Sequence, residues 1–294
     1  MHNVTEQYEL DAQKSLGQLY REWEGCTKCQ LGLRRDQLCT KMVQGEGMTR
    51  AIMMVGESPG ETEESLGRPF MGKSGYLLHK ILNSMGAGDL VYLTNIVACR
   101  SCQQRVDKDG NLMFMKRGKA PPTPRWEDIP PSKQQVDACW PRFHQELYQV
   151  DPIIIVTMGN PATEALFGHT FHSTRERGRP ETIQVDGVGF EPSYTEKKGA
   201  WIRSYNPEVG FVMPTLRAKV DYTVIPTIHP AYVSRKTTDF SADSPFKQLN
   251  ADIRLAIKVY ERYMLEVHGV TPSCDSDAEV QDDDAQDSQE DAAG

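Results

Sequence analysis

The sequence has no apolar run long enough to cross a membrane. Nowhere in its 294 residues do the ~18 apolar residues of a membrane-spanning helix follow one another. Residues Met1 to Glu6 have neither the basic start nor the apolar stretch of a signal peptide. The hydrophobic fraction of 38% is ample for a core. We therefore expect a soluble, cytoplasmic protein with no membrane partner.

The sequence also lacks positive charge at its end. From Asp275 to Gly294 it has nine acidic residues and no Lys or Arg, while the rest of the chain has a net charge of +1. Such a segment buries too little apolar surface to fold, so we expect residues 271–294 to be a disordered acidic tail. The tail either keeps the protein soluble, or competes with nucleic acid for a basic groove or recruits a protein partner.

A disulfide framework is not expected either, because the chain has seven cysteines but no secretory signal. Cys26 and Cys29 are spaced so that two thiolates reach one metal, and Cys99 and Cys139 complete a set of four. Four thiolates hold either a zinc ion or an iron–sulfur cluster, and the spacing does not decide between them. Cys102 is a rival ligand, and the alternative is that the thiols are unrelated.

Short buried strands alternating with amphipathic helices indicate an α/β fold with a parallel sheet covered on both faces. The domain is expected over residues 1–270, with insertions at about 103–131 and 179–221. The second insertion, rich in Gly, Pro and aromatic residues, is expected to contain a β-hairpin. The expected strands are Ala51–Val55, Val91–Asn95, Ile153–Met158 and Thr223–Thr227. The expected helices are Thr5–Glu22, Ser74–Met85, Lys133–Tyr148, Pro161–Phe167 and Asn250–Val267.

The polar motifs follow the predicted strands. Gly56–Gly60 comes after the first strand, Asn95 ends the second, Gly159 and Asn160 follow the third, and His229 follows the fourth. Open α/β sheets bind ligands at the carboxyl ends of their strands. We therefore expect these four loops to form one site.

Gly67–Ser74 matches the phosphate-binding pattern G-x-x-x-x-G-K-[ST]. The preceding predicted strand ends about a dozen residues earlier, and Pro69 removes one of the N–H donors that would hold phosphate. No predicted strand ends in the Asp that would hold magnesium. Nucleotide hydrolysis is therefore not favoured.

Eight short motifs follow one another along the chain: Cys26–Cys29, Val55–Gly60, Gly67–Gly72, Leu93–Arg100, Cys139–Pro141, Gly159–Ala162, Arg177–Gly178 and Pro226–Pro230. In this order they resemble the uracil-DNA glycosylases of the iron–sulfur class, family 4. The resemblance implies a three-layer α/β/α sandwich around a central four-stranded parallel sheet. It also implies a [4Fe–4S] cluster on Cys26, Cys29, Cys99 and Cys139, with zinc the less favoured alternative.

The resemblance also implies roles in base recognition. An enzyme that acts on a base in duplex DNA must first flip it into a pocket. Phe70 corresponds to the family's stacking residue, and the Asn95 carboxamide matches the N3–H and O4 of uracil. The alternatives are a core aromatic for Phe70 and a strand-end cap for Asn95.

Three further residues are expected at the reacting bond. His229 would stabilise charge developing on O2 of the departing base. Ser58 stands where the best-known branch of the superfamily has Asp, so no carboxylate base is assigned. Glu57 is the first candidate for positioning water or gripping the base. Glu61, Glu63 and Glu64 are interpreted as a solvated face or helix start.

DNA contacts are expected from Arg235, from the backbone of Gly56 to Gly60, and from Val233 or Tyr232 as a wedge. The first insertion contains Lys116–Lys119 but no His, so the covalent trapping found in a related branch is not expected there. It is either a DNA-backbone contact or a solvated loop.

The sequence thus predicts a uracil-DNA glycosylase that leaves an abasic site for base-excision repair. Two alternatives stay open. One is a glycosylase for another modified base, in phage DNA metabolism or antiviral defence. The other is an inactive DNA- or partner-binding protein with the same fold.

Overall fold

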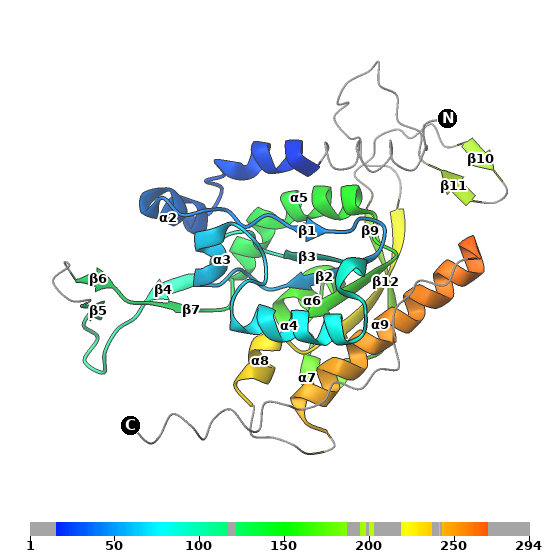
Figure 1. The fold of residues 1–294 in the computed structure, drawn as a ribbon. Helices are drawn as coiled ribbons and strands as arrows, with labels where there is room; N and C mark the ends of the chain where they lie inside the picture. Colours follow the sequence, from blue (N-terminus) through cyan, green and yellow to red (C-terminus); the bar gives the residue numbers. More distant parts are fainter. Residues whose placement is uncertain are drawn as a thin grey trace.

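A six-stranded sheet forms the centre of the protein (Figure 1). The computed structural model describes residues 16–116, 122–186, 195–197, 200–202, 219–236, 241 and 243–269. The strand order is β1 (Glu46–Gly47), β3 (Val91–Asn95), β2 (Ile52–Gly56), β8 (Ile154–Met158), β12 (Lys219–Thr227) and β9 (Glu181–Asp186).

The four central strands run parallel, as predicted, but the two edge strands run antiparallel to their neighbours. The sheet is therefore mixed and six-stranded, and the expected count of four was too low. β1 has only two residues, too few for a pattern to show. β9 pairs with the start of β12, which begins at Lys219 rather than Thr223. β9 and the first three residues of β12 lie in the segment, about 179–221, that was interpreted as an insertion.

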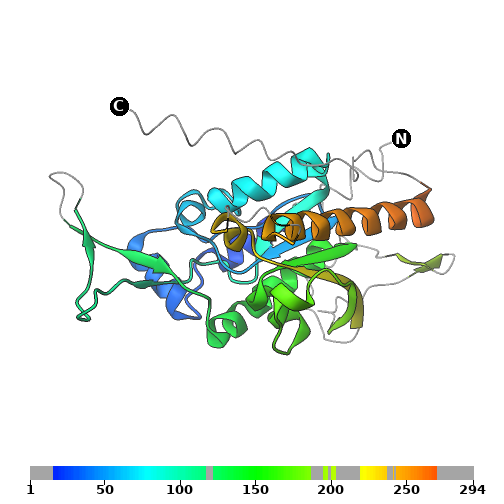
Figure 2. The ribbon, with the colours of Figure 1, turned by 90° about the horizontal axis from the view of Figure 1, so that it is seen from below.

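Alternate residues of each strand point into two separate cores, as the period of two in a strand requires. In β2, Met53 and Val55 enter one core, and Ile52 and Met54 enter the other. The first core lies under helical residues 16–24, α5 (Lys133–Val150) and α6 (Asn160–Phe167). The second lies under α4 (Lys73–Ser84), α8 (Pro230–Ser234) and α9 (Pro245–His268). The predicted three-layer sandwich is confirmed (Figures 1 and 2).

The long helices agree with their predicted ranges, except that α9 begins five residues early. The start of the N-terminal helix lies outside the described residues. Five of the described helices were not predicted: α2 (Gln30–Leu38), α3 (Glu61–Leu66), the 3₁₀ helix η1 (Gly88–Leu90), α7 (Ser173–Glu176) and α8. All except α2 carry too few residues for a periodic pattern.

The first insertion forms a β-ribbon that stands out from the body in both views (Figures 1 and 2). β4 (Cys102–Gln104) pairs with β7 (Trp126–Asp128), and β5 (Phe114–Met115) pairs with β6 (Thr123–Pro124). In the second insertion, β10 (Thr195–Lys197) pairs with β11 (Ala200–Ile202), in line with the expected hairpin. The predicted acidic tail lies outside the described residues. None of the described helices is long and apolar enough to cross a membrane.

Candidate active site and thiol cavity

The carboxyl ends of the parallel strands lie level at one edge of the sheet. Gly56 pairs with Asn95, and Met158 pairs with Thr227. Backbone hydrogen bonds then tie the loops together, because Ile96 N–H donates to Gly56 O at 2.9 Å and Val97 N–H donates to Glu57 O at 3.2 Å. The loops that carry the predicted site residues therefore start side by side.

Three of the predicted residues meet at Gly56. A Cβ on Gly56 would overlap Oδ1 of Asn95 and would lie 2.7 Å from Cζ of Phe70. The side chains of Phe70 and Asn95 are both 5% exposed. Phe70 has φ of +52°, in the left-handed region that a non-glycine residue rarely adopts. The ring and the carboxamide are thus held at one point, and Gly56 lacks the side chain that would fill it.

Glu63 holds the two loops of this site together. Its Oε2 accepts from Gly60 N–H at 3.1 Å, and its Oε1 accepts from Gly72 N–H at 2.8 Å. Gly60 begins α3, and Gly72 begins α4. Because α3 precedes Gly67–Ser74, that segment does not join a strand to a helix as a phosphate loop does.

Glu61, Glu63 and Glu64 were expected to form a solvated face or a helix start. They do lie in the first turn of α3, but the solvated face is wrong for two of them. Glu61 is exposed, with 72% of its side-chain area accessible, but Glu63 and Glu64 are buried. Glu64 forms ion pairs with Arg34 and Arg100 instead of facing solvent. Sequence alone did not indicate these partners, which lie 30 and 36 residues away.

His229 is the N-cap of α8, and its Nδ1 accepts from Ala231 N–H at 3.1 Å. A neutral imidazole that accepts at Nδ1 carries its proton on Nε2. Burial, with a smaller effect from Arg235, lowers the pKa of His229 to about 4. Gly159, with φ of +90°, faces this residue, and a Cβ there would lie 3.3 Å from the His229 Cβ. His229 is therefore a neutral donor at Nε2 near pH 7.

Glu57 and His229 share Arg235 as a charged neighbour. Burial raises the pKa of Glu57, and Arg235 opposes that effect. Arg235 itself is exposed at the end of α8, and Ser58 is half-buried beside Glu57. Glu57 and His229 thus have one charged neighbour in common. The predicted base-binding residues Phe70 and Asn95 meet at Gly56, the residue before Glu57.

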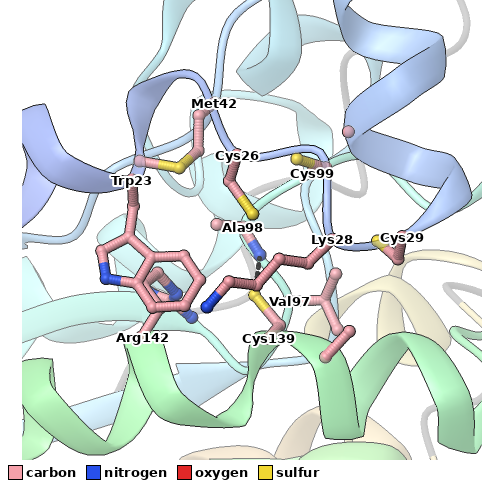
Figure 3. Close-up of a pocket in the computed structure, with 12 residues that line it drawn as sticks. Trp23, Cys26, Lys28, Cys29, Met42, Val97, Ala98, Cys99, Cys139 and Arg142 are labelled. Atoms are coloured by element: carbon pink, nitrogen blue, oxygen red, sulfur yellow. Dashed lines mark hydrogen bonds between the residues drawn. The ribbon is translucent and has the colours of Figure 1, made fainter.

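The four predicted metal ligands Cys26, Cys29, Cys99 and Cys139 line one cavity, and their sulfurs point into it (Figure 3). Cys102 does not line this cavity; the charged groups around it are Arg34, Arg100, Glu64 and Asp128. Cys39 is exposed, and Cys274 lies outside the described residues. Cys99 therefore lines the cavity with the other three predicted ligands, and the rival ligand Cys102 does not.

Two of these sulfurs accept hydrogen bonds. Arg35 Nη1 donates to Cys99 Sγ at 3.7 Å, and Ala98 N–H donates to Cys139 Sγ at 3.5 Å. Burial raises the pKa of the Cys99 thiol to about 12, although Arg35 opposes this. No three His, Cys, Asp or Glu side chains in the described part of the chain lie close enough to hold a single metal ion.

A buried polar network next to the cavity was not predicted. Arg142 and Glu146 on α5 are 1% and 0% exposed and form an ion pair of 2.6 Å. Their spacing of four residues was the only signal in the sequence, and it is also the spacing of ordinary surface pairs.

Comparison with known proteins fits this arrangement. Residues 44–254 match the family model of the uracil DNA glycosylase superfamily. The chain is 32% identical over 209 residues to a type-4 uracil-DNA glycosylase of Sulfurisphaera tokodaii, covering 69% of this chain and 79% of that protein. It is 29% identical to the type-4 enzyme of Archaeoglobus fulgidus, covering 71% and 89%, and 32% identical to that of Thermotoga maritima, covering 58% and 77%.

The chain therefore belongs to the uracil-DNA glycosylase superfamily and, within it, to the type-4 family. Members of this family typically carry an iron–sulfur cluster. The resemblance inferred from the motifs is confirmed.

Proposed function

We propose that this protein hydrolyses the N-glycosidic bond between uracil and deoxyribose in DNA, leaving an abasic site for base-excision repair. Membership of the type-4 family supports this activity, and with it binding to uracil-containing DNA. The observation that carries the proposal is the meeting of the Phe70 ring and the Asn95 carboxamide at Gly56.

Phe70 and Asn95 bind the flipped base in this scheme. A base stacked on an aromatic ring gains about 1–3 kcal/mol, which offsets part of the cost of unstacking it from the duplex. The Asn95 amide accepts from N3–H of uracil through Oδ1 and donates to O4 through Nδ2. Cytosine offers an acceptor at N3 and a donor at N4, so the same amide orientation mispairs with it and excludes it.

His229 stabilises the departing base. Breaking the glycosidic bond places negative charge on the pyrimidine, much of it at O2. The Nε2–H that the Ala231 hydrogen bond implies is the donor that this oxygen needs. Because the low pKa keeps the ring neutral at pH 7, it acts by donating a hydrogen bond rather than as a general acid.

Glu57 positions the attacking water or the base. Its partly buried carboxyl group lies near Arg235, which favours the ionised form needed to accept a hydrogen bond from water. Ser58, without a carboxylate, contributes at most a hydroxyl contact. The weak base is sufficient because the sugar already has oxocarbenium character when water attacks.

The backbone of Gly56 to Gly60 and the side chain of Arg235 hold DNA phosphates. Tyr232 is partly exposed, whereas the Val233 side chain is buried in the core with α4 and α9. We therefore assign the wedge that fills the gap in the duplex to Tyr232 and not to Val233.

Cys26, Cys29, Cys99 and Cys139 would hold a [4Fe–4S] cluster that braces the scaffold. All four sulfurs face one cavity, so they can reach one bound group (Figure 3). Hydrogen bonds from Arg35 and Ala98 suit thiolate ligands.

A panel of oligonucleotides tests the activity. Purified protein is incubated with single- and double-stranded DNA containing one uracil, cytosine, hypoxanthine, 5-hydroxymethyluracil or thymine, and abasic sites are then cleaved with alkali. Release of uracil but not cytosine or thymine supports the proposal. Release of another base alone would favour the alternative substrate, and binding without release would favour an inactive relative.

A further inference from the structure

Within the described buried network, Arg142 contacts the backbone at the carboxyl end of β3, where Asn95 lies. Its Nη2 donates to the carbonyl oxygen of Asn95 at 2.7 Å and to that of Ile96 at 3.1 Å. The side chain is 1% exposed, so both bonds are shielded from water. Charged donors form stronger hydrogen bonds than neutral ones, and their strength rises in a buried setting.

Glu146 holds this guanidinium in place. Its Oε2 accepts from Arg142 Nη1 at 2.6 Å, and its carboxylate also accepts from Tyr20, Tyr92 and Thr94. These hydroxyls leave the carboxylate little freedom to turn. The two side chains thus form an ion pair that is shielded from solvent.

The segment after Asn95 is thereby held on both sides. On its N–H side, Ile96 and Val97 donate to the carbonyls of Gly56 and Glu57. On its carbonyl side, Arg142 accounts for the bonds to Asn95 and Ile96. Since a peptide unit is planar, holding both its N–H and its C=O restrains the backbone beside Asn95 and hence the direction in which the Asn95 Cβ leaves the backbone.

The same guanidinium reaches the thiol cavity. Arg142 lines that cavity together with Cys139, which precedes it by three residues on α5 (Figure 3). One side chain thus lies against a proposed cluster ligand and against the residue that reads the base.

We propose that Arg142, oriented by Glu146, is a positioning residue that aims the Asn95 carboxamide at the base. The expected effect on uracil release rests on the proposed function. The claim that Arg142 holds the backbone of residues 95–97 does not.

A merely stabilising ion pair is the competing explanation. Replacing a buried pair by uncharged residues of similar volume often leaves stability unchanged, whereas removing one partner strands a charge. The test variant is therefore the double substitution Arg142→Met with Glu146→Gln. Arg34→Met with Glu64→Gln is the matched control, since this ion pair is also largely buried but Arg34 bonds the Arg100 carbonyl and not Asn95.

Single-turnover kinetics and a thermodynamic cycle distinguish a positioning role of Arg142 from a merely stabilising one. We expect the double substitution to slow uracil release by about 10²-fold, the loss that a displacement of ~1 Å can cause, with a much smaller change in the affinity for DNA. In an Asn95→Ala background it should slow release by less than about 3-fold further, because groups that act through one another are not additive. Equal losses in both backgrounds would overturn the proposal.

Amide hydrogen exchange gives a readout that needs no activity. The N–H groups of Ile96 and Val97 should exchange faster in the Arg142→Met, Glu146→Gln variant. Their exchange should be unchanged in the Arg34→Met, Glu64→Gln control, at equal midpoints of thermal unfolding. Unchanged exchange at both amides would also overturn the proposal. If the wild-type protein released no uracil while exchange still rose, the proposed function would fail and the positioning would stand.

Discussion

Gly56 and Asn95 are so close that a Cβ on Gly56 would overlap Oδ1 of the carboxamide. The two residues pair across β2 and β3, which brings the first glycine of one loop to the last residue of the neighbouring strand. The space that a base edge needs beside the carboxamide therefore depends on the absence of a side chain at Gly56.

Gly56→Ala tests this relationship. The added methyl group must displace Asn95 or the Phe70 ring, and we expect uracil release to fall by about 10²-fold, as expected for a misplaced reactive geometry. Steady-state assays on single-stranded uracil DNA measure the loss. Gly17→Ala is the control, because the nearest neighbouring atom to a Cβ there, Arg21 Nη1, is 3.5 Å away. Full activity in Gly56→Ala would show that the base does not bind at this point.

Glu63→Ala should uncouple the two loops that carry Gly60 and Gly72. Both backbone N–H groups lose their carboxylate acceptor, and each such bond to a charged group contributes about 1.5–3 kcal/mol. We expect a lower midpoint of thermal unfolding together with a fall in kcat/KM of at least about 10-fold. The exposed Glu61→Ala should change neither quantity appreciably. Equal behaviour of the two variants would rule out the clamp.

The cavity thiols give a prediction about iron. Cys99→Ser should lower bound iron and the broad absorbance near ~400 nm expected of an iron–sulfur cluster. Cys102→Ser should leave both close to wild type, because Cys102 lies outside the cavity. Iron analysis and visible spectra on proteins purified without oxygen provide the measurement. A colourless Cys102→Ser protein beside a brown Cys99→Ser protein would reverse the assignment.

His229 should titrate far below an ordinary histidine. Its pKa of about 4 means that the native state stays unprotonated where the unfolded state, near 6.5, binds a proton. The free energy of unfolding should therefore fall as pH drops from about 6.5 toward 4, and His229→Gln should remove that part of the slope. Long-range ¹H–¹⁵N spectra should show a proton on Nε2 throughout. A titration midpoint near 6.5 would contradict the buried, neutral ring.

Glu57 contributes to the pH dependence of the free energy of unfolding with the opposite sign to His229. Because its pKa is raised above the ordinary value of 4.5, the native state keeps a proton that the unfolded state has released. Its contribution to stability declines as pH rises through that window. Comparing Glu57→Gln with His229→Gln across the same pH range separates the two groups.

The central strands could be predicted because β2, β3 and β8 are buried on both faces and read as continuous apolar runs. The edge strand β1 could not be predicted, since Glu46 and Gly47 form a strand only through their pairing with Leu93 and Tyr92. The positions of the site loops could be predicted because the loops follow those strands. The contact between Gly56 and Asn95 depends on the register of β2 and β3, which the order of the motifs does not give.

The burial of the charged residues could not be predicted from the sequence for a related reason. Glu63 reads as a surface residue until the backbone of Gly72 is folded against it. Arg142 and Glu146 read as a surface pair until α5 is laid on the sheet. In each case the partner is supplied by tertiary structure, while local propensity and periodicity report only on the residue's own element.

The most direct test of the whole account is the rate of uracil release by Asn95→Ala relative to wild type. The carboxamide supplies both hydrogen bonds that identify the base, so we expect a loss of at least about 10²-fold, the cost of removing one well-placed donor. Iron content and unfolding midpoint should stay at wild-type values. Wild-type rates in a correctly folded Asn95→Ala protein would contradict the claim that this strand end reads uracil.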